Sequence, residues 1–204
     1  MACRKTIGQN IKINERQKSR YPSLSTKPAA ATHPHASEKN RGAVMKIESG
    51  KLERLKFLSR VIEKESHHLA VSLSRVFKEP FTVERAKTAY SDEDFSESLE
   101  AFTSRFARLQ DTLGDKLIPH LLNAMGEKPA SVIDNLDKAE RFGWITSADE
   151  WLAIRDLRNQ MVHEYIEDLV KLTSAIQTAQ IFVPTLLSAA KALENELQKR
   201  GWSV

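Results

Sequence analysis

Eight consecutive residues, Arg158 to Tyr165, carry the side chains that a phosphodiester-cleaving site needs. Arg158 is a permanent cation, and His163 has an imidazole, whose ordinary pKa is about 6.5. An imidazole can take the proton of a ribose 2′-hydroxyl while a guanidinium donates hydrogen bonds to the charge that builds on the phosphoryl oxygens. The chemistry that suits this pair is metal-independent cleavage of RNA, with Asn159 orienting the substrate or fixing the imidazole tautomer. DNA lacks the internal nucleophile and should not be cut.

The motif is more specific than its Arg-x4-His spacing. That spacing alone is expected about 0.4 times by chance in a chain of this composition, and requiring the Asn and the Tyr lowers the expectation to the order of 0.001. Each residue alone has a structural explanation: an arginine at a helix edge extends its stem over the core, and a histidine near a helix C-terminus favours the macrodipole. The joint pattern favours the functional interpretation.

The helix that must position the motif has an apolar stripe. Its core spacing is shared by Trp151, Ile154, Arg158, Met161 and Tyr165. Because a buried, unpaired guanidinium is costly, Arg158 must have a partner or border a cleft. His163 lies about 140° further around an ideal helix, so the two side chains do not share a face. Their convergence requires a helix ending near His163, the reach of the arginine side chain, or a second copy of the chain.

The rest of the body predicts an all-α fold. From residue 46 onward apolar residues recur at three- and four-residue steps, and no stretch alternates with the period of a strand. We expect an antiparallel up-and-down bundle of four long helices with one or two short extra helices. The long helices are expected over about 46–79, 92–125, 151–163 and 167–201, and a shorter one should begin at Lys128-Pro129.

Several residues predict where these helices begin, end or bend. Pro80 should end the first, the run Ser91–Asp94 should cap the second, and Gly126 should close it in a left-handed conformation. Ser147 to Glu150 has the spacing of a capping box, and Pro184 should kink the last helix.

Composition limits the function classes. The chain has 204 residues, of which 41% are hydrophobic and 28% charged, as in ordinary soluble proteins. Its most apolar run, Ile181 to Leu187, is far shorter than the roughly 20 residues of a membrane span. Cys3 is the single cysteine, so neither a disulfide framework nor a cysteine zinc site is possible. His67, His68 and His120 lack the spacing of metal ligands, so we expect no bound metal. We also expect no cofactor. The single cysteine fits a reducing cytoplasm, so we expect a cytoplasmic location.

The net charge of +4 comes from the first 44 residues. They hold nine Lys/Arg against two acidic residues, whereas residues 45–204 hold 22 basic and 25 acidic ones. A basic leader can contact nucleic acid or act as a transit peptide. Because residues 1–44 lack helical periodicity and precede Met45, we interpret them as a dispensable disordered tail or an upstream extension, and residues 45–204 as one helical domain.

The motif and its flanks resemble the HEPN superfamily, and within it the HepT-like toxins. The likeness is carried by Ala139–Ile145, Ser147–Glu150 and Leu157–Tyr165, and the other helices match only as amphipathic stripes. The resemblance implies a homodimeric bundle in which Arg158 and His163 of both copies are catalytic and Asn159 supports them.

The resemblance also implies partners. The chain would be the ribonuclease of a type VII-like toxin–antitoxin pair, with transfer RNA as the expected substrate. A minimal nucleotidyltransferase antitoxin would silence it by AMPylation of Tyr165, which adds negative charge and bulk beside the catalytic pair. A related branch consists of noncatalytic substrate-binding partners of nucleotidyltransferases, and that is the alternative function. A helical structural protein with an accidental motif is a third.

Overall fold

The computed structural model describes residues 47–128, 130–163 and 168–203, with their side chains except at 162 and 163. Every regular element within these ranges is helical, which confirms the all-α prediction. The elements are α1 (Ser49–Val76), α2 (Val83–Thr88), α3 (Glu93–Asp111), the π-helix η2 (Thr112–Leu117), α4 (Ile118–Ala124), α5 (Val132–Arg141), α6 (Ala148–His163) and α7 (Leu169–Lys199). The predicted tail, residues 1–44, lies outside the described residues.

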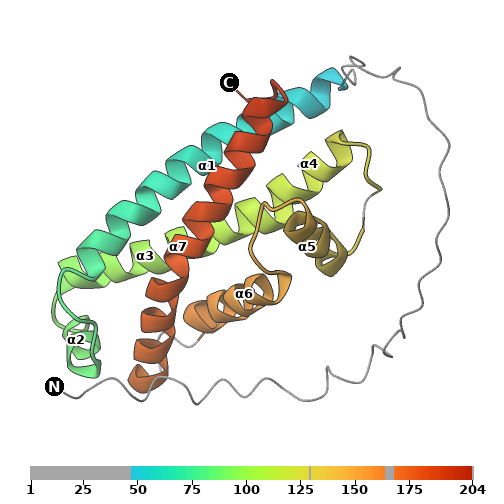
Figure 1. Ribbon diagram of the computed structural model, residues 1–204. Coiled ribbons are helices and arrows are strands. Elements are labelled where there is room, and N and C mark those ends of the chain that lie inside the picture. The colour runs from blue at the N-terminus through green and yellow to red at the C-terminus, as the bar shows by residue number, and fades with distance from the viewer. Residues whose placement is uncertain (1–46, 129, 164–167, 204) are drawn as a thin grey trace, which may run out of the picture. The chain divides into compact units, whose positions relative to one another are not determined.

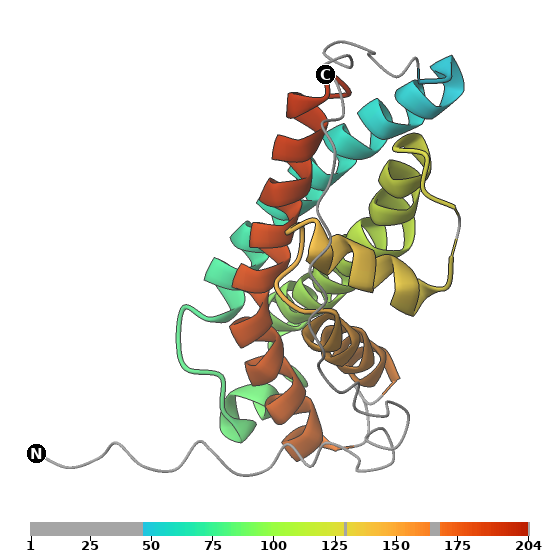
Figure 2. The same ribbon diagram turned by 45° about the vertical axis from the view of Figure 1, so that its right-hand side comes forward.

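The helices pack around one continuous helical rod, which is formed by α3, η2 and α4 (Glu93–Ala124). Helices α3, η2 and α4 follow one another along it (Figure 1), and α1 packs along its length. Helix α7 packs against α1, α2, α3 and α6. Helix α5 contacts both α4 and α6, and Figure 2 shows α5 and α6 on the same side of α7. This arrangement places α6, which carries the motif, directly against α3.

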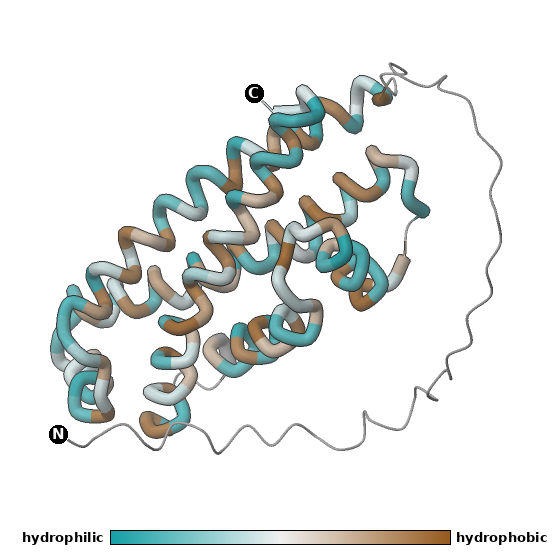
Figure 3. Tube along the Cα trace, in the orientation of Figure 1, coloured by the Kyte–Doolittle hydropathy of each residue, from teal (hydrophilic) through white to brown (hydrophobic). Residues whose placement is uncertain are grey.

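The core is made from one face of each long helix. Apolar and polar residues alternate along the helices (Figure 3), as amphipathic packing requires. In α1 the buried positions include Leu55, Leu58, Ile62 and Leu69, each at most 1% exposed. Burying such a side chain fully stabilises the fold by about 1.5–3 kcal/mol. The core therefore fixes which face of each helix is left for function.

Most helix boundaries follow the predicted caps. The Asp92 carboxylate accepts a hydrogen bond from the backbone N–H of Phe95 at 3.0 Å, and Gly126 closes the rod with a φ of 86°. The predicted start of α5 at Lys128-Pro129 is wrong, because Ser131 and Asp134 form a capping box that begins the helix at Val132.

The predicted capping box of α6 forms in half. Ser147 accepts from the N–H of Glu150 at 3.2 Å, but the Glu150 carboxylate accepts from Thr146. Glu140 of α5 binds the N–H of Ala148 at 2.7 Å, so a neighbouring helix contributes to the cap.

The sequence predicted one regular helix over about 92–125, but the structure departs from this prediction. Residues Thr112 to Leu117 form a π-helix, which is rare and often found at functional sites. This wide turn coincides with the close approach of α6. A Cβ atom placed on Gly114 would lie 2.7 Å from Nε1 of Trp151, so only a residue without a side chain fits beneath this indole. Gly114 and Trp151 therefore fix how closely α6 approaches the rod.

We predict that Gly114→Ala destabilises the fold by about 1–3 kcal/mol, because the added methyl group would overpack the contact with Trp151. Gly50→Ala is the matched control, since a Cβ at Gly50 meets nothing within 4 Å. That control should be neutral or stabilising, by up to about 1 kcal/mol, because alanine loses less backbone entropy on folding. Chemical denaturation measures both, and equal stability of Gly114→Ala and the wild type would contradict the described contact.

Candidate functional site

Helix α6 presents the motif arginine at the flank of its buried face. Trp151, Ile154, Leu157 and Met161 are all buried, with 1%, 0%, 6% and 2% exposure. Arg158 lies beside this stripe, and its side chain is 31% exposed. The sequence pattern required a partner or a cleft for this guanidinium, and the structure provides a partner.

That partner is a carboxylate from the rod. Nη2 of Arg158 donates to Oδ2 of Asp111 at 2.6 Å, and Nη1 donates to the side-chain oxygen of Asn159 at 2.9 Å. The third donor, Nε, is buried and has no partner among the described residues. Two of the three predicted catalytic residues, Arg158 and Asn159, are therefore in direct contact.

A second ion pair lies one turn earlier in α6. Nη1 of Arg155 donates to Oδ1 of Asp115 at 2.7 Å, and both side chains are about one-third exposed. The two pairs join the same two segments of chain, α6 and the junction of α3 with η2. Partly exposed ion pairs of this kind contribute on the order of 1 kcal/mol or less each, because water screens them. Their main effect is on register and side-chain orientation.

A third carboxyl lies on the α1 side of the rod. Burial raises the pKa of Glu65, and the neighbouring Thr112 hydroxyl and the charges of Arg108 and Lys116 offset part of that rise. The negative charge of Asp111 adds to the rise. Burial therefore makes the Glu65 carboxyl easier to protonate than an ordinary glutamate.

Polar groups also lie beneath the ion pairs. Gln110 is fully buried, and neither its amide nitrogen nor its amide oxygen has a partner among the described residues. The indole nitrogen of Trp151 is buried in the same condition. The Gln110 amide nitrogen and the Trp151 indole nitrogen both lie next to Gly114 of the π-turn.

The other two predicted site residues are His163 and Tyr165. His163 is the last residue of α6, but its side chain lies outside the described residues, as does Tyr165. The structure therefore brings together Arg158 and Asn159 and leaves the predicted convergence with His163 untested. Asp111, Asp115 and Glu65 were missed by sequence reasoning. The one available signal was that Arg158 needed a partner.

Three further histidines, His67, His68 and His120, lie within the described part of the chain. Nδ1 of His120 is 2.7 Å from the carbonyl oxygen of Lys116, within its own helix. The rings of His67 and His68 lie edge to face, 5.6 Å apart. Within the described part of the chain, no group of three or more His, Cys, Asp or Glu residues could hold a metal ion.

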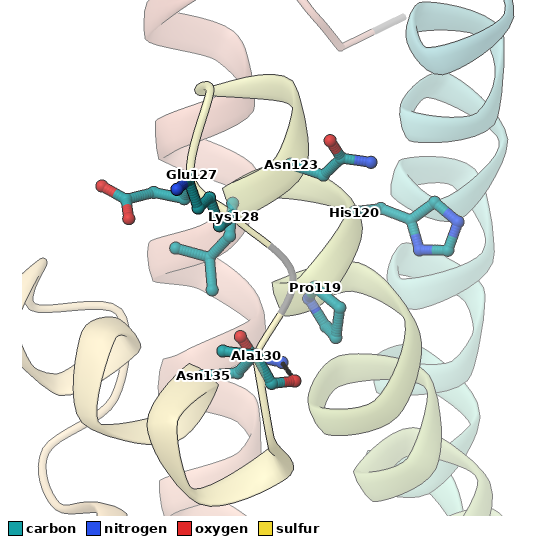
Figure 4. A pocket seen from close by; sticks show the side chains of 8 residues that line it. Pro119, His120, Asn123, Glu127, Lys128, Ala130 and Asn135 are labelled. Atoms are coloured by element: carbon teal, nitrogen blue, oxygen red, sulfur yellow. Dashed lines mark hydrogen bonds between the residues drawn. The ribbon is translucent and has the colours of Figure 1, made fainter.

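A cavity of about 190 Å³ lies where the α4–α5 connection folds back over α4 (Figure 4). It is lined by Pro119, His120, Leu122, Asn123, Glu127, Lys128, Ala130 and Asn135. None of these lining residues belongs to the motif, and Arg158 and Asn159 do not line the cavity. The cavity is therefore separate from the motif surface.

Comparisons of the chain with protein-family models, curated proteins and solved structures find no match. None of the described helices has the length and apolarity that a membrane span requires. The geometry of the motif is therefore the basis for any statement about function.

We predict that Glu65→Gln stabilises the protein at pH 7.5. The folded-state pKa of Glu65 is raised above the ordinary value of 4.5, so wild-type stability falls as the pH rises through that raised pKa. The neutral amide avoids this loss. Thermal unfolding of both proteins between pH 4 and 8 should show an advantage of the variant that grows with pH and is smallest at pH 4. A variant less stable than wild type at pH 7.5 would mean that attraction to Arg108 and Lys116 outweighs burial.

Proposed function

We propose that this chain is a metal-independent ribonuclease of the HEPN type that acts in the cytoplasm as a toxin. The observation that carries the proposal is the Arg158 guanidinium, held by Asp111 and Asn159 at the edge of the helix that ends with His163. A guanidinium fixed in place before substrate binds is suited to stabilise charge that develops on a phosphoryl group.

In the proposed reaction, His163 removes the proton from a ribose 2′-hydroxyl. The 2′-oxygen attacks the adjacent phosphorus and Arg158 donates to the non-bridging oxygens. The bond to the 5′-oxygen of the next nucleotide breaks, and this oxygen takes up the proton that the His163 imidazolium releases, directly or through water. The products are a 2′,3′-cyclic phosphate and a 5′-hydroxyl, so no oxidant, reductant or metal is consumed. Asn159 orients Arg158 through its side-chain oxygen, as the 2.9 Å contact supports.

The proposal includes a homodimer. Arg158 and His163 lie five residues apart on α6, which corresponds to about 140° of rotation, so one regular helix directs them to different sides. A two-fold axis near the motif would let Arg158 of one copy work with His163 of the other. A minimal nucleotidyltransferase that adds AMP to Tyr165 would then place a phosphate beside both arginines and block the substrate.

The same geometry gives the second candidate some support. The Asp111 carboxylate already neutralises Arg158 at 2.6 Å, and a neutralised arginine is also consistent with a noncatalytic substrate-binding partner of a nucleotidyltransferase. That function predicts a stable complex with the nucleotidyltransferase and intact RNA when this chain is produced alone.

We predict that the full chain, expressed without an antitoxin, degrades discrete RNA species in the cell. His163→Ala should lower cleavage by about 10²–10⁴-fold through loss of the general base, and Arg158→Ala by about 10²–10³-fold through loss of phosphoryl stabilisation. Total RNA on a denaturing gel is the measurement.

Arg155→Ala is the matched control for Arg158→Ala, because it removes the neighbouring arginine of the same helix and the parallel ion pair with Asp115. It should leave cleavage nearly unchanged. Intact RNA with folded wild-type protein would favour the noncatalytic partner, and equal losses in both arginine variants would attribute the effect to folding.

We also predict that cleavage by the purified protein persists in EDTA, because the proposed nucleophile and acid–base groups need no Lewis acid. The measurement compares initial rates in EDTA and in Mg²⁺ at equal ionic strength. Abolition of cleavage by EDTA, restored by adding back a divalent cation, would contradict the mechanism.

A further inference from the structure

Two ion pairs of similar geometry connect α6 to the junction of α3 with η2, but only one of them involves the motif. Arg158 pairs with Asp111 at 2.6 Å, and Arg155 pairs with Asp115 at 2.7 Å. Side-chain exposure is 31% for both partners of the first pair, and 36% and 33% for those of the second. Their stabilising effects should therefore be similar, and any functional difference between them should come from the arginine that each one holds.

The Arg158 guanidinium is held more completely than an ion pair alone would require. Asp111 binds one Nη group from the rod, Asn159 binds the other from α6, and Nε is buried. These constraints fix both the position and the plane of the guanidinium. Because a free arginine side chain loses rotamer entropy when it is ordered, fixing it beforehand removes that cost from the catalytic step.

The opposite end of the contact is also fixed. Asp111 is the last residue of α3, directly before the π-turn, and Gly114 of that turn lies under Trp151 of α6. The carboxylate therefore belongs to the segment that sets the distance between the two helices. A surface carboxylate on a mobile loop could not define the plane of the guanidinium in this way.

We propose that Asp111 is the positioning residue of the ribonuclease site. It holds the partly exposed Arg158 side chain in place, and the remaining N–H groups of the two Nη atoms would donate to the phosphodiester of the RNA. Asp111 does not contact the reacting atoms, and no proton or bond passes through it. This inference rests on the proposed function. It adds to that function a residue 47 positions away in sequence, on a different helix.

A competing interpretation of the Asp111 contact predicts the opposite change in cleavage rate when the carboxylate charge is removed. If the Asp111 carboxylate masked Arg158 and had to leave before RNA could bind, removing its charge would raise the affinity for RNA and the cleavage rate. If Asp111 positions Arg158, removing its charge releases the guanidinium and lowers the rate. The direction of the change in kcat distinguishes the two.

The experiment compares Asp111→Asn with Asp115→Asn in the full chain. Each variant removes one carboxylate charge, keeps the side-chain volume and breaks one ion pair between the same elements. We expect kcat for RNA cleavage to fall about 10–100-fold in Asp111→Asn, as for other residues that orient catalytic groups, with KM changed less than about threefold. Asp115→Asn should change neither value by more than about threefold, although both variants should have similar unfolding temperatures.

Two further measurements separate positioning from folding. In an Arg158→Ala background, Asp111→Asn should cause no further loss of activity, because its effect acts through Arg158. In ¹⁵N NMR spectra without RNA, rotation of the Arg158 guanidinium should be slow in the wild type and in Asp115→Asn, and fast in Asp111→Asn. Additive losses of activity, or unchanged guanidinium rotation in Asp111→Asn, would overturn the proposal.

The outcomes also separate this proposal from the proposed function. Cleavage by wild type with equal rates in the two aspartate variants, or a faster Asp111→Asn, would overturn the role of Asp111 and leave the ribonuclease intact. Absence of cleavage by folded wild type would overturn the ribonuclease and the positioning role of Asp111 with it. The guanidinium measurement would in that case identify the contact as a structural ion pair.

Discussion

The packing of Trp151 against the bare backbone of Gly114 is the constraint on which the candidate site depends. A side chain at residue 114 would collide with the indole, so the distance between α6 and the rod is set by the absence of a Cβ atom. This distance brings the carboxylates of Asp111 and Asp115 within reach of two arginines on α6. The ion pairs are thus compatible with the close packing at Gly114 and add to it.

The region around this contact combines apolar anchors with a buried polar side chain. Ile154 and Leu113 are fully buried, and they anchor α6 and η2. Gln110 is equally buried, and its amide nitrogen lies next to Gly114 of the π-turn. A π-turn within an α-helix is rare and often lies at a functional site. The surrounding apolar core therefore holds this irregular turn in place.

The helices and most of their ends could be predicted from the sequence, because their signals are local. Apolar spacing identified the long helices. Asp92 caps the start of α3 and Gly126 adopts the left-handed conformation after α4, both as predicted. The capping box at Ser131 was overlooked in favour of Lys128-Pro129. The second long helix, which contains η2, was predicted to be regular throughout. A π-turn has no sequence signature comparable to a proline or a cap.

The candidate site could be predicted only in part, because its second half is nonlocal. The sequence indicated Arg158 and its need for a partner, but not Asp111, since a contact across 47 residues depends on the register of two helices. That register depends on Gly114 and Trp151, whose contact is itself visible only in three dimensions. His163 and Tyr165 remain sequence predictions.

The most direct test of the central claim is the chemistry of the cleaved ends. Purified protein would be incubated with an RNA oligonucleotide that it cuts, and with the same oligonucleotide carrying a single 2′-deoxy nucleotide immediately 5′ to the cut. We expect a 2′,3′-cyclic phosphate and a 5′-hydroxyl on the RNA products, and no cleavage at the 2′-deoxy position. Cleavage at that position, or a 3′-hydroxyl end, would contradict attack by the 2′-hydroxyl and the roles assigned to Arg158 and His163.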